Sequence, residues 1–324
     1  MELSLIAENL LAAPVLFFLL GMAATWLGSD LDVPQSIARG LSLYLLFSIG
    51  IHGGYELAES GWTAGMLSIL GVAVLSAIIV PIWSFYILRQ FLGPNDAGAI
   101  AATYGSISAV TFVTAVDFLR SNEVEFGGYM VAAMALMESP SIVVGVLLAR
   151  LSSEDGNGRP KGELWRRLFQ EAFLNGAVVI LLGSLLIGLV TGDKGWPSVE
   201  PFAGAPFKGV LCLFLLEMGL GAARQVKALA KCGPFLLTFG IVAPIVHGTG
   251  AVLIARLIGA SAGDATLLAV LCGSASYIAV PAAVRFALPK AKPGLYLPLS
   301  LGVTFPFNVS IGIPLYYALV TLLW

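Results

Sequence analysis

Two short polar stretches lie inside otherwise apolar segments: Gly105-Ser106-Ile107-Ser108-Ala109-Val110-Thr111 and Gly273-Ser274-Ala275-Ser276-Tyr277. Each falls near the middle of a run long enough to cross a bilayer, which takes about 20 apolar residues. Glycine and hydroxylated residues weaken a helix, and Pro281 removes a backbone donor after the second stretch. Irregular backbone is tolerated inside a membrane where it lines a cavity or is buried in protein. We therefore expect two breaks, each between two half-helices.

The composition is that of a membrane protein. Of the 324 residues, 58% are hydrophobic and 11% are charged, and the mean hydropathy is +0.92. A soluble domain carries about 25% charged residues, because it must cover its surface with them. The net charge of −2 argues against a nucleic-acid partner, which calls for a basic patch. The three cysteines match no metal-ligand spacing, so we expect neither a transition metal nor a cofactor.

Hydropathy predicts an all-α polytopic membrane protein with ten transmembrane helices. A polar stretch in the middle of the chain predicts a linker over residues 152–168. It separates a first unit of five spans, residues 1–151, from a second unit of five spans, residues 169–324. The spans are expected at 10–27, 38–54, 63–89, 97–119, 126–150, 169–190, 207–222, 233–256, 264–286 and 294–322.

The distribution of basic residues supports this number of spans and orients them. Of the 17 Lys and Arg residues, 4 fall on one set of alternate connections, which leaves 13 on the other set. Basic residues accumulate on the cytoplasmic side of a membrane. The linker 152–168 is therefore expected in the cytoplasm, and both termini and a Trp-Pro loop at 196–197 outside. The four outer basic residues are Arg120, Lys194, Lys208 and Arg256.

The two units resemble each other at a nearly constant offset. The stretch 39–50 matches 208–219 at an offset of 169. Asp96 and Asp264 each precede a break by nine residues. Because each unit has an odd number of spans, the second must be inverted relative to the first. Inverted repeats with discontinuous helices are typical of secondary transporters, which bind substrate near the membrane midplane.

Helix breaks of this kind suit a small anion. The N-terminus of a half-helix presents unpaired N–H groups and a partial positive charge. Small residues that only let helices pack closely are the alternative interpretation. The occurrence of both stretches at equivalent positions favours a substrate site. Its expected residues are Gly105, Ser106, Ser108, Thr111, Gly273, Ser274, Ala275 and Ser276.

Oxygen-bearing side chains near the breaks suggest a coupling cation. Glu138 and Asn308 lie in apolar runs, 170 residues apart, and an intramembrane carboxylate indicates function by default. With the hydroxyls of Thr304 and Ser108, they form a set of oxygen donors suited to sodium. A proton is the competing coupling ion, and a polar pair that only joins helices is the other alternative. Asp117 lies nearer the end of its span and is expected to face the membrane interface.

The sequence also resembles a known family. The stretches Leu271–Arg285 and 303–316 are similar to the second half of the cyanobacterial sodium-dependent bicarbonate transporters, and the similarity extends more loosely over nearly the whole chain. The resemblance implies two inverted five-helix repeats with crossed broken helices. These form a core domain and a gate domain that move relative to each other as an elevator.

The same resemblance implies a homotrimer in the plasma (inner) membrane that imports bicarbonate with sodium. It also implies inhibition by a PII-like cytoplasmic protein. The chain departs from the family pattern in two places: Ala109-Val110 stands where the family has Gly-Ser, which loses a hydroxyl, and Glu138 replaces an aspartate. Both changes leave the anion and the sodium geometry open.

We therefore expect a sodium-coupled bicarbonate symporter and not an enzyme. The first alternative is a transporter of another small anion or carboxylate, coupled to sodium or protons. A second is an intramembrane hydrolase with Ser106 or Ser108 as nucleophile and His247 as base. It is disfavoured because the first unit has no histidine that matches His247. A structural or receptor-like protein would give no reason for polar groups at mid-span in both units.

Overall fold

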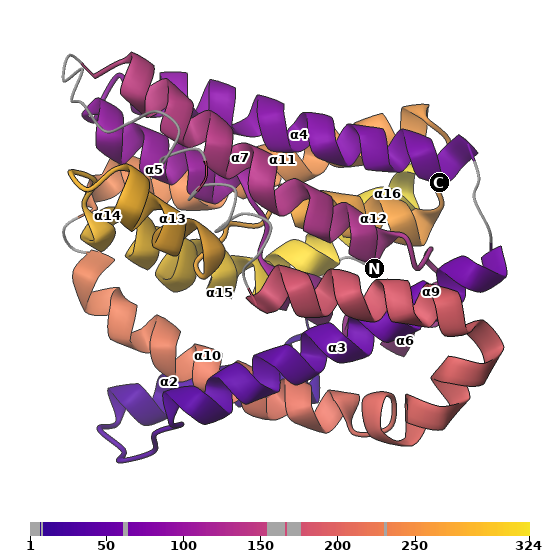
Figure 1. Ribbon diagram of the computed structural model, residues 1–324. Coiled ribbons are helices and arrows are strands. Elements are labelled where there is room, and N and C mark those ends of the chain that lie inside the picture. Colours follow the sequence, from indigo (N-terminus) through magenta and orange to yellow (C-terminus); the bar gives the residue numbers. More distant parts are fainter. Residues whose placement is uncertain (1–6, 8, 61–63, 154–165, 167–175, 230–231) are drawn as a thin grey trace.

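The computed structural model describes residues 7, 9–60, 64–153, 166, 176–229 and 232–324, and all regular secondary structure in this part of the chain is helical (Figure 1). The helices before the linker are α2 (Ala13–Trp26), α3 (Gln35–Ser60), α4 (Ala64–Leu88), α5 (Pro94–Gly105), α6 (Ala109–Ser121) and α7 (Met130–Leu151). Those after it are α9 (Gly176–Ala203), α10 (Phe207–Leu229), α11 (Gly233–Leu257), α12 (Ala262–Cys272), α13 (Ala279–Ala287), α14 (Pro293–Leu299), α15 (Phe305–Phe307) and α16 (Ile313–Leu323). Two π-helical turns, η1 (Ser300–Thr304) and η2 (Asn308–Gly312), flank α15.

Seven helical segments in the described ranges are long and apolar enough to cross a membrane. They confirm the prediction of a multi-pass membrane protein. Each of the ten expected spans overlaps a helix or a series of consecutive helices. The seven segments are Ala64–Leu88, Pro94–Ser121, Met130–Leu151, Gly176–Ala203, Phe207–Val226, Gly233–Leu257 and Pro293–Leu323.

The predicted loop at 196–197 is wrong, because α9 runs on to Ala203. Gly192 has φ 48° and ψ −133°, so the chain bends there and then resumes as helix. A residue with a Cβ rarely adopts this conformation, whereas glycine adopts it without steric cost. A glycine at a bend is easily mistaken for the end of a span.

The helices form two groups, visible in Figure 1. The four-helix group consists of α2, α3, α9 and α10, and the larger group contains α4 to α7 and α11 to α16. In the four-helix group α2 packs on α10 and α3 packs on α9, so each pair joins a helix from before the linker to one from after it. In the larger group, α4, α5 and α7 contact one another, and α11, α12 and α16 do likewise.

Glycines set the close approach in the four-helix group. A Cβ at Gly21 would collide with the backbone of α10, and a Cβ at Gly188 would collide with that of α3. Gly50 and Gly219 likewise face the backbones of α9 and α2. Gly188 follows Gly21 by 167 positions and Gly219 follows Gly50 by 169, so the two pairs repeat one arrangement. Small residues allow this approach between helices in a membrane.

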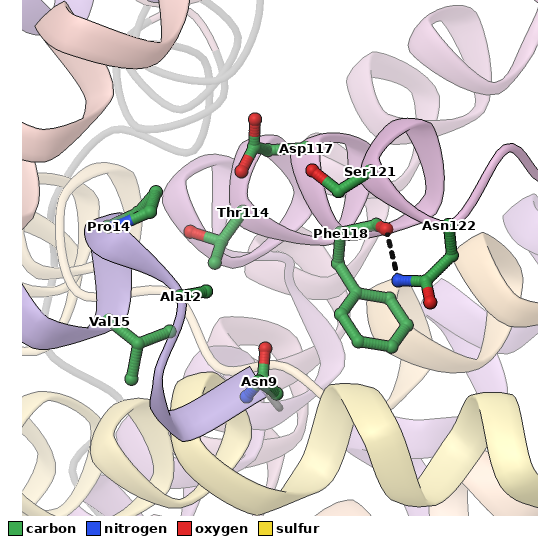
Figure 2. A pocket seen from close by; sticks show the side chains of 9 residues that line it. All are labelled: Asn9, Ala12, Pro14, Val15, Thr114, Asp117, Phe118, Ser121 and Asn122. Carbon is green, nitrogen blue, oxygen red and sulfur yellow. Dashed lines mark hydrogen bonds between the residues drawn. The ribbon is translucent and has the colours of Figure 1, made fainter. Parts of the chain in front are cut away.

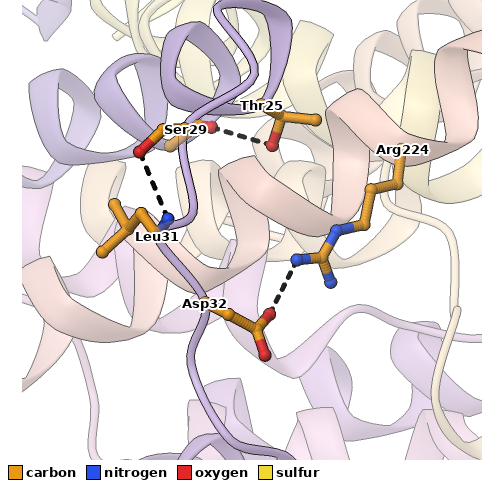
Figure 3. Close-up of polar contacts among 6 residues, drawn as sticks. Thr25, Ser29, Leu31, Asp32 and Arg224 are labelled. Atoms are coloured by element: carbon orange, nitrogen blue, oxygen red, sulfur yellow. Dashed lines mark hydrogen bonds and ion pairs between the residues drawn. The ribbon is translucent and has the colours of Figure 1, made fainter.

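Polar contacts in the connection between α2 and α3 are weaker. The amide of Leu31 donates to Ser29 Oγ at 3.2 Å, and Arg224 Nη2 of α10 lies 2.7 Å from Asp32 Oδ1 (Figure 3). The Arg224 and Asp32 side chains are 56% and 65% exposed, and exposed ion pairs contribute about 0–1 kcal/mol. Backbone packing at the glycines therefore matters more than this pair for holding the group together.

Candidate functional site at the two helix breaks

The first break separates α5 from α6. The helix α5 ends at Gly105, Ser106 is extended, and Ser108 is the N-cap of α6. Ser108 Oγ accepts hydrogen bonds from the Thr111 amide at 3.2 Å and from Thr111 Oγ1 at 2.9 Å. A serine N-cap satisfies a helical N–H that has no partner in the helix. The α6 terminus is thus organised by its own sequence.

The second break separates α12 from α13 over residues 273–278. Ser274 Oγ donates to Leu271 O at 2.9 Å, at the end of α12. The Val280 amide reaches Ser276 Oγ only at 3.4 Å, and the N-cap residue Ile278 makes no side-chain cap. The α13 terminus therefore has a weaker cap of its own than α6.

The structure brings the two breaks into direct contact. The Ser108 amide donates to Ser274 Oγ, and the Ser276 amide donates to Thr103 O, both at 2.9 Å. The hydroxylated residues of the predicted substrate site are all buried, at 0–3% exposure. These residues are Ser106, Ser108, Thr111, Ser274 and Ser276.

At the starts of the two half-helices that follow the breaks, four backbone N–H groups donate to no other described residue. They are the N–H groups of Ala109 and Val110 in the first turn of α6, and those of Ile278 and Ala279 at the start of α13. Unpaired N–H groups at a helix N-terminus attract negative charge. The two half-helices thus offer donors next to a shared set of hydroxyls.

Two of the predicted cation ligands, Glu138 and Asn308, contact different breaks. Asn308 Nδ2 donates to Gly273 O of the second break at 2.8 Å, which leaves Asn308 Oδ1 as an acceptor, with Tyr316 Oη 3.4 Å away. The Glu138 carbonyl accepts from Ser106 Oγ of the first break at 3.2 Å. Among the described residues, no hydrogen bond or ion pair engages the Glu138 carboxylate, and none joins it to Asn308.

Thr304 is bound into the helix packing. Thr304 Oγ1 donates to Gly240 O at 2.7 Å, so Tyr104 Oη must be the donor in the 2.6 Å contact between the two hydroxyls. In a helix, Gly240 O would accept from the amide four residues later, but Pro244 has no N–H there. The Thr304 hydroxyl supplies the missing donor. Sequence reasoning missed Tyr104, although it directly precedes Gly105.

The sequence model of the Na+-dependent bicarbonate transporter superfamily matches residues 13–321, nearly the whole chain. The chain belongs to this superfamily. The resemblance found in the sequence is therefore confirmed at the level of the family. A comparison with curated proteins finds no match.

His247 in this transporter is a buried group that packs on an aromatic ring. It is 6% exposed and lies edge-on to Trp83, with ring centroids 4.9 Å apart. Among the described residues, no hydrogen bond joins the His247 ring to Ser106 or Ser108. The hydrolase alternative needs a base that is hydrogen-bonded to the nucleophile, and His247 makes no such bond to either serine in this structure.

Two aspartates anchor the helices that lead into the breaks. Asp264 of α12 accepts from the Gly127 amide at 2.8 Å, from Tyr129 Oη at 2.6 Å and from Ser261 Oγ at 2.7 Å. The Tyr129 hydroxyl is the donor in its bond, because an ionised carboxylate only accepts.

Asp96 of α5, in the first unit, makes the corresponding contact with the second unit. It accepts from the Lys292 amide at 2.8 Å, and Lys292 Nζ lies 3.7 Å away. Each aspartate thus binds the backbone that precedes the last helical segment of the opposite unit. The signal in the sequence was the equal nine-residue spacing from each aspartate to its break.

Proposed function

We propose that this transporter is a sodium-coupled symporter that imports bicarbonate. The observation that carries the proposal is the contact between the two breaks, with free amides and buried hydroxyls from both half-helices around it. Membership of the superfamily indicates the substrate and the coupling ion.

The proposed architecture is a pair of inverted five-helix repeats, residues 1–151 and 169–324, joined by the linker 152–168. Reciprocal contacts support it, because Gly21 and Gly188 each pack on the second helix of the opposite unit. The two aspartate anchors are exchanged between the units in the same way. In this arrangement both termini lie outside and the linker is cytoplasmic.

Bicarbonate fits the donors at the breaks. Its negative charge is shared between oxygens that accept N–H bonds, and its remaining O–H needs one acceptor. The amides that open α6 and α13 would supply the N–H bonds, and a serine oxygen would accept the O–H. The proposed site consists of Gly105, Ser106, Ser108, Thr111, Gly273, Ser274, Ala275 and Ser276, with the amides of Ala109, Val110, Ile278 and Ala279.

Sodium would bind beside this anion, through the Glu138 carboxylate, Asn308 Oδ1 and the hydroxyls of Thr304 and Ser108. Hard cations take oxygen ligands, and the Glu138 carboxylate has no other partner in the described chain. Binding of one sodium ion together with one bicarbonate ion leaves the net charge of the protein unchanged. The cost of carrying either ion alone into a low-dielectric interior disfavours uncoupled movement.

The proposed movement is that of an elevator. The four-helix group is the gate, because backbone contacts at its glycines leave little room for change, and the larger group is the core that slides past it. We further propose that three chains associate through their gates, that the protein resides in the plasma (inner) membrane, and that a PII-like protein binds its cytoplasmic side.

Uptake of labelled bicarbonate into vesicles that contain the purified protein tests the function. Uptake should be driven by an inward sodium gradient and abolished when choline replaces sodium. Glu138→Gln should lose most of the sodium stimulation, whereas Glu123→Gln, in the connection before α7, should keep it. Uptake that is independent of sodium, or no bicarbonate uptake, would refute the proposal.

The second candidate is a transporter of another small anion or carboxylate. It is favoured by Ala109-Val110, where the site offers amides and side-chain methyl groups but no hydroxyl. Competition of unlabelled carboxylates with bicarbonate uptake, with and without a proton gradient, separates the two.

A further inference from the structure

A cavity of about 190 Å³ lies between the start of α2 and the C-terminal half of α6, away from the breaks (Figure 2). One wall is the segment from Asn9 to Val15, and the other is α6. A water molecule takes up about 30 Å³ in the liquid, so the cavity can hold a small ion with part of its water shell. It is lined by Asn9, Ala12, Pro14, Val15, Thr114, Asp117, Phe118, Ser121 and Asn122.

Several donors among the polar side chains of this cavity are already engaged elsewhere. Asn9 Nδ2 donates to Val309 O at 2.9 Å and to Ser310 O at 3.1 Å. In a helix, Ser310 O would accept from the amide four residues later, but that residue is Pro314, which has no N–H. Asn122 Nδ2 donates to Phe118 O at 2.8 Å. The Asn9 amide can therefore offer only its oxygen to the cavity, and the Asn122 amide offers its oxygen and one N–H.

The residues of α6 complete the same pattern. Thr114 Oγ1 donates its proton to Val110 O at 2.8 Å and keeps its lone pairs free. Asp117 adds a carboxylate that is 14% exposed. Oxygen acceptors around one carboxylate, with few free donors, select a hard cation over an anion.

A lysine already competes for this carboxylate. Lys208 Nζ of α10 lies 3.6 Å from Asp117 Oδ2 and 3.1 Å from Ser121 Oγ, and its side chain is 52% exposed. The next basic residue, Arg120, stacks over the Phe126 ring at 5.8 Å. Lys208 belongs to the four-helix group and Asp117 to the larger group, so the pair bridges the two groups.

Polar residues on α6 lie between the first break and the cavity. Thr111, Thr114, Asp117 and Ser121 follow one another at spacings of three, three and four, and residues so spaced are neighbours on a helix. This polar row runs from the first break to the cavity wall.

We propose that this cavity is a second, outer sodium site, and that Lys208 is its built-in competitor. Sodium at Asp117 displaces the lysine ammonium, and the charged bridge between the two groups opens. This inference rests on the proposed sodium coupling and adds an entry site to it.

Binding of radioactive sodium to the purified full-length protein in detergent tests the site without transport. Asp117→Asn should weaken sodium binding about tenfold, and Lys208→Gln should strengthen it about threefold. The double variant should behave like Asp117→Asn, because the lysine acts through the carboxylate. Asp193→Asn and Lys194→Gln remove the same charges from the exposed end of α9 and should change nothing.

The opposite signs of the two effects make the test decisive. A merely destabilised fold would not strengthen sodium binding in Lys208→Gln. Weaker binding in both variants, or no shift in either, would refute the outer site. If bicarbonate uptake depends on sodium while neither variant shifts binding, the outer site alone fails. If binding shifts as expected but no sodium-driven bicarbonate uptake occurs, the proposed function alone fails.

Discussion

The two breaks occupy equivalent positions in the sequence, yet they are held in different ways. At the first break Ser108 caps α6 through Thr111, three residues away. At the second break the corresponding cap, from Ser276 to the Val280 amide, is long at 3.4 Å. There the carbonyl of Gly273 depends on Asn308, 35 residues further along the chain. The start of α6 is thus stabilised by residues close to it in the sequence, whereas the second break depends on residues far away in the sequence.

This difference suggests a division of work. A half-helix with its own cap keeps its shape when its neighbours move, whereas one held by distant contacts responds to them. In the proposed mechanism, the second break is therefore the side at which sodium bound near Asn308 would affect the proposed anion site.

The largest difference in stability between equivalent substitutions is expected at the two aspartates that anchor the helices leading into the breaks. Asp264→Asn should lower the free energy of unfolding by about 3 kcal/mol. The carboxylate of Asp264 accepts three hydrogen bonds, whereas the NH2 group of asparagine is itself a donor and cannot accept them. Asp96→Asn should cost about 1 kcal/mol, since Asp96 has one backbone donor and an exposed lysine. The midpoint of thermal unfolding in detergent measures both, and equal losses would remove the contrast.

The next contrast lies between the first serines of the two breaks. Ser274 Oγ links the Ser108 amide to Leu271 O, so Ser274→Ala leaves a buried N–H without a partner. Such a loss costs about 1–3 kcal/mol. Ser106 Oγ makes a single bond to the Glu138 carbonyl, and Ser106→Ala should cost less than about 1 kcal/mol. An equal or larger loss in Ser106→Ala would show that the two breaks are not held as the hydrogen bonds indicate.

The smallest contrast concerns the caps themselves. Ser108→Ala should cost about 1 kcal/mol, the usual value of a serine N-cap. Ser276→Ala should cost only a few tenths of a kcal/mol through its 3.4 Å cap, although its bicarbonate uptake should fall because a hydroxyl of the site is lost. Unfolding midpoints and uptake measured on the same preparations separate stability from substrate binding. A Ser276→Ala variant less stable than Ser108→Ala would reverse the comparison.

The sequence by itself determined the membrane class, the positions of the helices and the location of both breaks. Apolar run length and the weakness of Gly-Ser stretches in a helix are local properties, so they can be read along the chain. The bend at Gly192 was missed for the same reason, because a glycine ends a helix or bends it according to what packs beside it.

Only the tertiary structure decided which groups meet. Asp117 was expected at the membrane interface, which stays a prediction, and the structure adds that it lines a cavity and faces Lys208, 91 positions away in the chain. Thr304 was expected as a sodium ligand, and its hydroxyl also replaces the donor that Pro244 lacks. Whether an oxygen remains free depends on the carbonyls that prolines expose on neighbouring helices, and the packing of those helices sets this. Sequence spacing carries no information about such pairings.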